Sequence, residues 1–388
     1  MKIIYLTCSR IPTEKAHGIQ IMQMLEAFSN FTEVELVIPK RRNLIKQDAF
    51  DYYGVKRNFQ ITWLPVLDLV PLDKYIGHLG FWLTSFSFLV SASFYLLFRK
   101  FDVLYTRDKM MLSLALGRKN IIFEAHTFPK KYFFYKWLLK KVKAIIVITE
   151  KLRRLYLEKG ISAKKVLTAP DGVDMDRFSI KKTKEECRLQ LNLPLDKQIV
   201  LYTGHLYQWK GVDALLEAAR QFPMVRPCSP PSVFNQFLKT LFVFVGGTEK
   251  DIAEFKEKAK GISNVMIVGH RPYSEIPYFL KAADVLVLPN SASEEISKSW
   301  TSPLKMFEYM AAEKPIVASD LASIREILNE NNAFLCKPDD SKSLRGAIEN
   351  ALQNPVLSAK IAQRAFNDVQ NFTWTKRAKA ILNFIDYD

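Results

Sequence analysis

The chain has 388 residues, of which 48% are hydrophobic, so it is long enough to bury the cores of two domains. Its net charge of +16 favours anionic partners, such as phosphorylated substrates, acidic lipid surfaces or nucleic acid. The four cysteines have no paired spacing, which argues against zinc and a disulfide framework and fits a reducing compartment. They are Cys8, Cys187, Cys228 and Cys336.

The N-terminal half of the sequence predicts alternating strands and helices. Lys2–Thr7 is too short an apolar run for a signal peptide, and we interpret it as a first strand. A polar loop ending at Gly18 and a helix over residues 19–28 follow, which is the opening of a nucleotide-binding α/β unit. Neither a Gly-x-Gly-x-x-Gly fingerprint nor a P-loop sequence is present. The further strands predicted in this half cover residues 34–38, 61–64, 102–106, 121–123, 144–148 and 166–168.

The segment from Leu79 to Phe98 contains no charged residue and is long enough to span a bilayer. Serine and threonine residues interrupt it, and a short predicted strand follows at Asp102. A crossover helix buried between a sheet and solvent has the same pattern. We therefore expect that this segment does not cross a membrane, and that any contact with a membrane is docking onto its surface.

Polar residues follow the strand predicted at 121–123, where the carboxyl end of a parallel strand faces a ligand crevice. His126 is therefore a candidate site residue, although a histidine that is satisfied at a strand end has the same pattern. The segment 130–165 is rich in lysine and arginine, with aromatic residues interleaved between Tyr132 and Trp137. Such a segment suits a surface facing anionic lipid, and it suits equally a solvated helix whose apolar side packs on the core.

The middle of the sequence contains a turn at 170–174 and a polar stretch at 179–195. Asp174 and Asp176 resemble a carboxylate pair for a metal, but they follow a turn and not a strand end, so we expect no metal site. The polar stretch marks a domain junction. The predicted domains cover residues 1–183 and 184–371, with a C-terminal helix over 372–388 that returns to the first domain.

A second series of strands and helices begins at the strand predicted over Ile199–Thr203. Gly204, at the end of this strand, allows a ligand to approach the backbone closely. Lys210, at the mouth of the next helix, is a plausible cation for a phosphate. The later strands predicted in this half cover residues 241–245, 265–268, 285–288 and 316–318.

The loop and helix between the last two of these strands predict an anion site. Ser302 is a suitable N-cap and Pro303 a suitable first helical residue, so we expect the helix to start there. The free N–H groups of Leu304 and Lys305, the helix dipole and the Lys305 charge would together attract an anion.

Glu308 lies about one turn further into this predicted helix, where it could accept two hydroxyls from a sugar ring beside the anion. An anion followed by a diol describes a nucleotide diphosphate and its ribose. An ordinary capped helix in an α/β sheet fits the same residues.

Taken in order and spacing, these motifs resemble those of retaining nucleotide-sugar glycosyltransferases of glycosyltransferase family 4. The resemblance covers nearly the whole chain. It rests on the loop near Gly18, residues 170–174, Gly204–Leu206 with Lys210 and Gly211, Val268 and Gly269, residues 283–289, Ser302–Lys305 with Glu308–Ala311, and Phe372–Trp374. It implies the GT-B fold, in which two Rossmann-like, doubly wound α/β domains face an interdomain cleft.

The resemblance also implies roles for individual residues. Lys210 would hold the donor diphosphate, Gly18 would let the first loop approach it, and Glu308 would bind the ribose hydroxyls. His126 would lie near the reacting sugar, so that His126 and Lys210 are the implied catalytic residues. The other implied donor-site residues are Gly204 and His205, then Gly269, His270 and Arg271 around the base, and Ser302, Pro303, Leu304 and Lys305 at the β-phosphate.

The sequence departs from the family pattern at two positions. His205 stands where the family usually has arginine, and Trp300 stands where the family usually has a second glutamate that contacts the donor sugar. Because of these two departures, the sequence does not identify the donor sugar. They also keep a non-catalytic nucleotide-sugar or scaffold protein on the same fold as the alternative to an enzyme.

The expected function is metal-independent transfer of a hexosyl or related sugar from a nucleotide-diphosphate sugar to a hydroxyl, without a cofactor. The expected acceptor is a saccharide or a lipid-linked saccharide, in surface polysaccharide, lipopolysaccharide or glycolipid synthesis. We expect a cytoplasmic protein with peripheral association to the anionic inner face of a membrane. Nucleic acid is not expected, because charge alone suggests it and no reader motif is present.

Overall fold

The computed structural model describes residues 1–129, 131–222 and 240–386, and these residues form two compact units. Unit 1 contains Met1–Asp171 together with the C-terminal segment from Trp374, and unit 2 contains Gly172–Thr373. Lys130, Cys228 and the C-terminal pair 387–388 lie outside the described residues.

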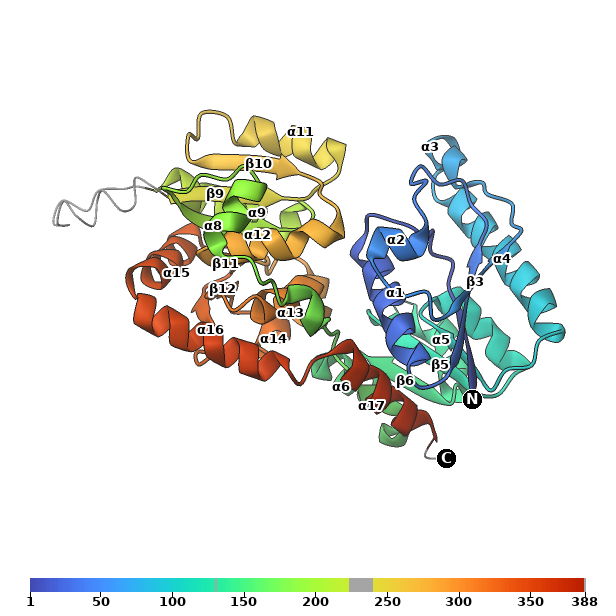
Figure 1. The fold of residues 1–388 in the computed structure, drawn as a ribbon. Helices are drawn as coiled ribbons and strands as arrows, with labels where there is room; N and C mark the ends of the chain where they lie inside the picture. Colours follow the sequence, from blue (N-terminus) through green and yellow to red (C-terminus); the bar gives the residue numbers. More distant parts are fainter. Residues whose placement is uncertain (130, 223–239, 387–388) are drawn as a thin grey trace. The chain divides into compact units, whose positions relative to one another are not determined.

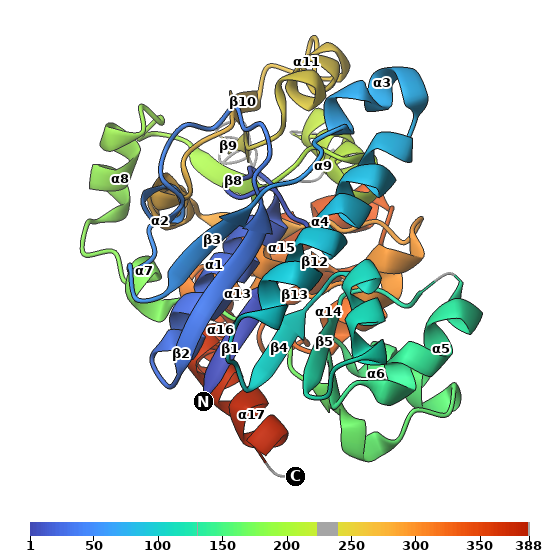
Figure 2. The same cartoon turned by 90° about the vertical axis from the view of Figure 1, so that its right-hand side faces the viewer.

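Unit 1 is built on a parallel sheet of seven strands in the order β3-β2-β1-β4-β5-β6-β7 (Figure 2). The strands are short and rich in Val, Ile and Leu, and all except the two edge strands β3 and β7 are almost entirely buried, as expected for a parallel sheet covered on both faces. Their bounds are β1 (Lys2–Leu6), β2 (Glu33–Pro39), β3 (Gln60–Leu64), β4 (Val103–Thr106), β5 (Ile121–Ala125), β6 (Ala144–Val147) and β7 (Val166–Thr168).

The helices of unit 1 connect these parallel strands as crossovers, and the last helix of the chain packs against the first. The α-helices are α1 (Ala16–Ser29), α2 (Ala49–Tyr53), α3 (Asp73–Ile76), α4 (Leu79–Leu97), α5 (Tyr132–Lys141), α6 (Glu150–Glu158) and α17 (Trp374–Asp386). The 3₁₀ helices are η1 (Val70–Leu72), η2 (Lys109–Leu116) and η3 (Ala163–Lys165).

Unit 2 is built on a parallel sheet of six strands in the order β10-β9-β8-β11-β12-β13 (Figure 1). The apolar residues of its strands form a core on each face of the sheet, one around Leu286 and Met306 and the other around Val200 and Phe244. The strand bounds are β8 (Gln198–Thr203), β9 (Thr240–Val245), β10 (Val265–Gly269), β11 (Val285–Leu288), β12 (Ile316–Ser319) and β13 (Phe334–Cys336).

The helices of unit 2 cover both faces of its sheet, and several begin at side-chain caps, such as Thr248 before α11 and Asp340 before α15. The α-helices are α7 (Met175–Phe178), α8 (Lys184–Gln190), α9 (Val212–Arg220), α11 (Glu249–Lys258), α12 (Ile276–Ala282), α13 (Leu304–Ala311), α14 (Ala322–Arg325), α15 (Ser341–Gln353) and α16 (Pro355–Val369). The 3₁₀ helices are η4 (Gln208–Lys210) and η5 (Tyr273–Glu275), and η6 (Ile296–Trp300) is a π-helix.

The uncharged segment predicted at 79–98 forms α4. Within the described part of the chain, α4 is the one helix long and apolar enough to cross a membrane, and 33% of its apolar window is buried in the protein. Core helices of soluble proteins pass the same test, so length and composition alone do not assign a span here.

Candidate functional site

The candidate donor site of unit 2 lies where its strand order reverses. Strands β8 and β11 are neighbours, but β9 and β12 continue the sheet from them in opposite directions. The loops that leave β8 and β11 therefore diverge, and ligands of open α/β sheets bind in the crevice that such loops leave at the carboxyl ends of the strands. The loop after β8 carries Lys210, and the loop after β11 leads to Lys305 on α13.

A glycine holds these two loops together. Gly211 follows Lys210 with φ of +75°, and a Cβ atom at this position would lie 1.7 Å from the carbonyl oxygen of Pro289, just after β11. Ser291 strengthens the contact by donating its N–H to the carbonyl of Trp209 at 3.1 Å. Only glycine allows this close approach, which fixes Lys210 beside the loop that follows β11.

Lys210 is partly buried and lies against an aromatic ring. Its Nζ is 3.9 Å from the centre of the Trp209 ring, in a cation–π contact. Burial lowers the pKa of Lys210 to about 8, because the ammonium loses much of its hydration. An anionic ligand in this position would replace the lost hydration and restore the charge.

The start of α13 differs from the prediction. The helix begins at Leu304, so Pro303 occupies the N-cap position and Ser302 precedes it, and no side chain caps the helix. Proline has no side-chain acceptor, and its fixed φ of −70° places its carbonyl to accept the N–H of Met306 at 2.9 Å. The N–H groups of Leu304 and Lys305 have no intrahelical acceptor, as expected at a helix start.

Lys305 is buried, and its Nζ lies 3.8 Å from the centre of the Tyr202 ring. Within the described part of the chain, this ammonium has no hydrogen-bond partner. Burial, and then repulsion by Lys210, hold the pKa of Lys305 well below its ordinary value, while Glu308 acts in the opposite sense. A buried, unpaired ammonium beside a second lysine is costly unless an anion joins the site.

Glu308 lies about one turn further along α13, as the sequence predicted, and it is also buried. Burial raises the pKa of Glu308 to about 7, although Tyr273, Arg177 and Lys305 each lower it. Tyr273 donates its hydroxyl to Glu308 Oε1 at 2.8 Å, and the Arg177 guanidinium covers the Tyr273 ring at 4.8 Å. Sequence reasoning missed Tyr273 and Arg177, because nothing in their local pattern indicates a contact with residue 308.

The other predicted donor residues lie at the carboxyl ends of β8 and β10. Gly204 has φ of +125° directly after β8, and Gly269 has φ of +83° at the end of β10. His270 and Arg271 follow in an exposed turn, where Arg271 is 3.8 Å from Glu275. These positions belong to the same edge of the sheet as Lys210.

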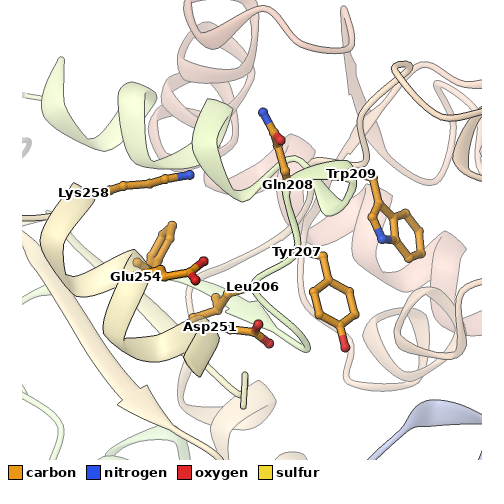
Figure 3. A pocket seen from close by; sticks show the side chains of 8 residues that line it. Leu206, Tyr207, Gln208, Trp209, Asp251, Glu254 and Lys258 are labelled. Carbon is orange, nitrogen blue, oxygen red and sulfur yellow. The ribbon is translucent and has the colours of Figure 1, made fainter. Parts of the chain in front are cut away.

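The His205 side chain lies against Tyr207 and α11. Its ring stacks on Tyr207 with centroids 4.8 Å apart, and its Nδ1 is 3.8 Å from Asp251. A pocket of about 400 Å³ lies between this loop and α11, as Figure 3 shows. Its lining residues are Leu206, Tyr207, Gln208, Trp209, Asp251, Glu254, Phe255 and Lys258, so it includes neither Lys210 nor Lys305.

Asp174, at the end of the turn at 170–174, serves a structural role. Asp174 is the N-cap of α7 and accepts the N–H of Asp176 at 3.1 Å, and it is 3.8 Å from Arg177. Among the described residues, no group of three or more His, Cys, Asp or Glu side chains is arranged to hold a metal ion.

His126 in unit 1 follows β5 and is held by a buried carboxylate. Its Nε2 lies 2.7 Å from Glu124 Oε1, and the same oxygen accepts the Gln20 amide of α1 at 2.6 Å. Burial, and then Arg107, lower the pKa of His126, while Glu124 opposes them. Sequence reasoning missed His17, which lies in the same region. Burial lowers the pKa of His17 most, followed by the charges of Arg107, Lys15 and His126.

The C-terminal helix completes this cluster. Arg377 of α17 forms an ion pair with Glu124 at 3.2 Å and donates to the carbonyls of Ala169 and Pro170. Burial alone would raise the pKa of Glu124, but Arg377 and then His126 hold it well below its ordinary range. No local sequence signal identifies Arg377, because its partners lie more than 200 residues earlier in the chain.

The structure corrects the predicted start of the first helix, which places Gly18 in the helix. This residue lies in the first turn of α1, and not in the preceding loop. A Cβ atom at this position would lie 2.1 Å from the Tyr53 hydroxyl, which itself bonds to the backbone of Thr13. Glycine is therefore required here by packing against Tyr53.

The chain matches two family models that together cover most of its length. Residues 21–177 match the model described as Glycosyltransferase Family 4, and residues 183–368 match the model described as Glycosyl transferases group 1. Both units thus have counterparts in glycosyltransferases, and two parallel α/β units of this kind make the GT-B fold of that class of enzymes. The chain belongs to glycosyltransferase family 4, with the GT-B fold.

Individual proteins agree with this assignment. The putative teichuronic acid biosynthesis glycosyltransferase TuaC of Bacillus subtilis is 26% identical over 270 residues, which cover 69% of this chain and 62% of TuaC, less than two thirds of it. A phosphatidyl-myo-inositol mannosyltransferase of Mycolicibacterium smegmatis is 24% identical over 71% of this chain and 68% of its own length.

Solved structures share the fold over the full chain. The structure of Anabaena HepE in complex with UDP and glucose has a TM-score of 0.72 at 16% identity, with 100% of this chain and 99% of that chain covered. Sucrose-phosphate synthase from Thermosynechococcus elongatus has a TM-score of 0.77 at 19% identity, with 99% and 98% covered.

Proposed function

We propose that this protein is a retaining glycosyltransferase that moves a sugar from a nucleotide-diphosphate sugar to a hydroxyl of a saccharide or lipid-linked acceptor. The observation that carries the proposal is the pairing of Lys210 with Lys305 at the open N-terminus of α13. Burial lowers the pKa of both ammonium groups, and no side chain caps the N-terminus of α13, where the first N–H groups have no intrahelical acceptor. This arrangement suits a pyrophosphate.

The chemistry follows from where charge develops. As the bond between the sugar C1 and the diphosphate oxygen breaks, negative charge grows on the leaving diphosphate, and Lys210, Lys305 and the helix N-terminus would stabilise it. The acceptor oxygen forms the new bond to C1, and its proton passes to the departing phosphate, so no enzyme nucleophile is needed. In this proposal neither a metal nor a cofactor takes part. His126 orients or polarises the reacting groups and does not act as a nucleophile.

Two further observations support the donor class. Glu308 lies one turn from Lys305 and, when ionised, can accept two ribose hydroxyls. HepE, which shares the fold, has been solved with UDP and with UDP-glucose. The names of TuaC and the phosphatidyl-myo-inositol mannosyltransferase support a role in polysaccharide or glycolipid synthesis. A position at the cytoplasmic face of a membrane is part of the proposal.

The test is substitution of the lysine nearest the leaving group. After a screen of nucleotide sugars has identified the donor, Lys210→Ala should lower the rate of transfer about 100-fold or more, the scale for losing one transition-state donor. Lys250→Ala is the matched control, because Lys250 is an exposed lysine on α11 of the same unit. Both variants should keep the wild-type circular dichroism spectrum, and wild-type turnover in Lys210→Ala would overturn the phosphate assignment.

A non-catalytic binding protein is the second candidate, because of one observation. Trp300 of η6 occupies the position where the family usually has a carboxylate for the donor sugar. Calorimetry with nucleoside diphosphates and nucleotide sugars separates the cases. An enzyme binds the nucleotide and turns over the sugar, a binding protein binds without turnover, and a scaffold binds neither.

A further inference from the structure

Helix α4 exposes large apolar residues on its outward side, although its inward side already buries Phe88, Ala92 and Leu96. A surface helix normally turns apolar residues inward and polar residues outward. In α4 the inward residues include Thr84 and Ser85 as well as Phe88. The outward residues are Leu79, Trp82, Phe86, Val90, Phe94 and Leu97, and each of them is at least 54% exposed.

Hydrogen bonds fix this orientation. Thr84 accepts the N–H of Leu69 at 2.9 Å, and Ser87 accepts the N–H of Leu67 at 3.0 Å. Ser91 donates to the carbonyl of Pro65 at 2.7 Å. The hydroxyl groups therefore bind the segment before η1 along two turns of the helix, and the apolar side cannot rotate inward without breaking these bonds.

A second apolar surface lies on α5. Phe133, Phe134 and Trp137 are 86%, 71% and 57% exposed, although α5 buries Leu139 completely. Both α4 and α5 pack against η2, so one short segment of unit 1 lies against both helices. We call the outward residues of α4 and α5 together the apolar face. Large exposed apolar patches mark interaction sites.

Cations border the apolar face, and two of them cover aromatic rings of α4 and α5. Lys141 Nζ is 3.7 Å from the centre of the Trp137 ring, and Lys136 and Lys140 are exposed on the same helix. Arg99, at the C-terminal end of α4, covers the Tyr95 ring at 4.8 Å. Aromatic rings with adjacent lysine and arginine are the composition of protein surfaces that lie at the boundary of an anionic bilayer.

We propose that the apolar face docks onto an anionic lipid bilayer, with α4 lying in the plane of the interface and the lysines of α5 contacting the headgroups. The bonds from Thr84, Ser87 and Ser91 keep α4 attached to unit 1, which is inconsistent with a helix that crosses the bilayer. A second copy of this chain is a poorer occupant, because the same cations would face each other across the contact.

The inference has a consequence for the acceptor. A transferase held at the membrane surface meets acceptors that are anchored there, so the acceptor would carry a lipid. The inference about a lipid-bearing acceptor rests on the proposed glycosyl transfer. The inference of lipid binding does not, so vesicle binding can fail or succeed independently of sugar transfer.

The apolar part of the inference is tested by flotation of the full chain with vesicles. Wild-type protein should float with vesicles of phosphatidylcholine and phosphatidylglycerol, and far less with phosphatidylcholine alone. The variant Trp82→Ser/Phe86→Ser/Phe94→Ser should bind at least tenfold more weakly, because it removes three side chains that would enter the bilayer. Leu189→Ser/Leu195→Ser/Val356→Ser is the matched control, because these residues are exposed apolar residues of unit 2.

The electrostatic part is tested with a second pair of variants. Lys136→Gln/Lys140→Gln/Lys141→Gln should lower the affinity for anionic vesicles by about fivefold for each lysine removed. Lys250→Gln/Lys256→Gln/Lys260→Gln changes the net charge equally on and beside α11 of unit 2, and it should bind vesicles nearly as wild type does.

Three results would overturn the proposal. The first is wild-type protein that does not float with anionic vesicles at low salt, and the second is equal loss of binding in the test and control variants. The third is sedimentation that shows a dimer without lipid, which the serine variant of α4 abolishes. Nucleoside-diphosphate affinity should be the same in all four variants, so a loss there would indicate misfolding and not lost docking.

Discussion

Lys305 and Glu308 carry opposite charges when ionised, yet burial drives both toward their neutral forms. The pKa of Lys305 is held well below its ordinary value, and the pKa of Glu308 is raised to about 7. Each group is poorly solvated in the protein alone, and their mutual attraction does not compensate. We interpret this as a site whose charges become favourable when a ligand supplies an anion and hydroxyl groups.

Glu308 should give nucleotide binding a dependence on pH near neutrality. Only the ionised carboxylate can accept two hydroxyls, and protonation of a group with a pKa of about 7 removes it as the pH falls. The affinity for the donor nucleotide should therefore fall by up to about tenfold for each pH unit below 7.

Calorimetric titration at several pH values measures this dependence. Glu308→Gln should bind more weakly than wild type at pH 8, and its affinity should not fall through pH 7 as that of the wild type does. Lys210 and Lys305 gain protons over the same pH range and favour the anion, and the Glu308→Gln variant keeps both lysines, so the ratio of the two affinities isolates Glu308. A ratio of wild-type to Glu308→Gln affinity that stays constant below pH 7 would contradict the assignment of the ribose hydroxyls to Glu308.

At the residue scale, the sequence was informative where function depends on local spacing. Lys305 and Glu308 share a helix, so their spacing alone places them on neighbouring turns. Tyr273 and Arg177 come from η5 and α7, and they meet Glu308 only because the fold brings these elements together. A single sequence contains no periodicity that reports such a contact.

At the element scale, the loop after β8 depends on Gly211. Gly211 has a positive φ, and its Cα lies too close to the Pro289 backbone to leave room for a Cβ atom. Any substitution would therefore introduce both backbone strain and a steric clash. The loop carries Lys210, and its position relative to β11 therefore depends on that contact.

Gly211→Ala should weaken nucleotide binding about tenfold or more, because the new methyl group would displace the loop from Pro289 and move Lys210 away from α13. Gly261→Ala is the matched control, because Gly261 has φ of +80° and a Cβ atom there would meet no other atom within 4 Å. Both variants carry the cost of a positive φ, so only the loss specific to Gly211→Ala reports the contact. Equal affinities in the two variants would refute this role.

Elements were predictable where hydrophobic runs are short and uninterrupted. Each predicted strand has a counterpart in the structure, from Lys2–Leu6 to Ile316–Ser319, because buried parallel strands have a distinctive apolar composition. Helix starts were harder to predict, as Gly18 and Pro303 show, because either residue is compatible with a loop or a first turn. The outward apolar side of α4 could not be predicted, since the sequence does not show which side faces the core.

At the scale of the whole molecule, the chain leaves unit 1 at Asp171 and returns to it at Trp374. Arg377, on the returning helix, is almost fully buried against Glu124, which has no exposed surface. Breaking a buried ion pair by removing one partner usually costs about 3–5 kcal/mol, because the other charge stays buried without compensation.

Arg377→Met should therefore destabilise unit 1 by about 3–5 kcal/mol and leave unit 2 unchanged. Calorimetry should show one unfolding transition moved to lower temperature, while the transition that responds to added nucleoside diphosphate stays in place. The double variant Glu124→Gln/Arg377→Met should lose less than the sum of the two single losses, because it removes both charges. Strict additivity would contradict the coupling.

The return of α17 to the first unit also determines when each part of the protein can fold during translation. Residues 172–373 are continuous, so they can fold as soon as they have left the ribosome. The first unit is synthesised earlier, yet its buried glutamate must wait for an arginine made more than 250 residues later. We expect the nascent N-terminal part to remain incompletely folded, and dependent on chaperones, until the second unit has been synthesised.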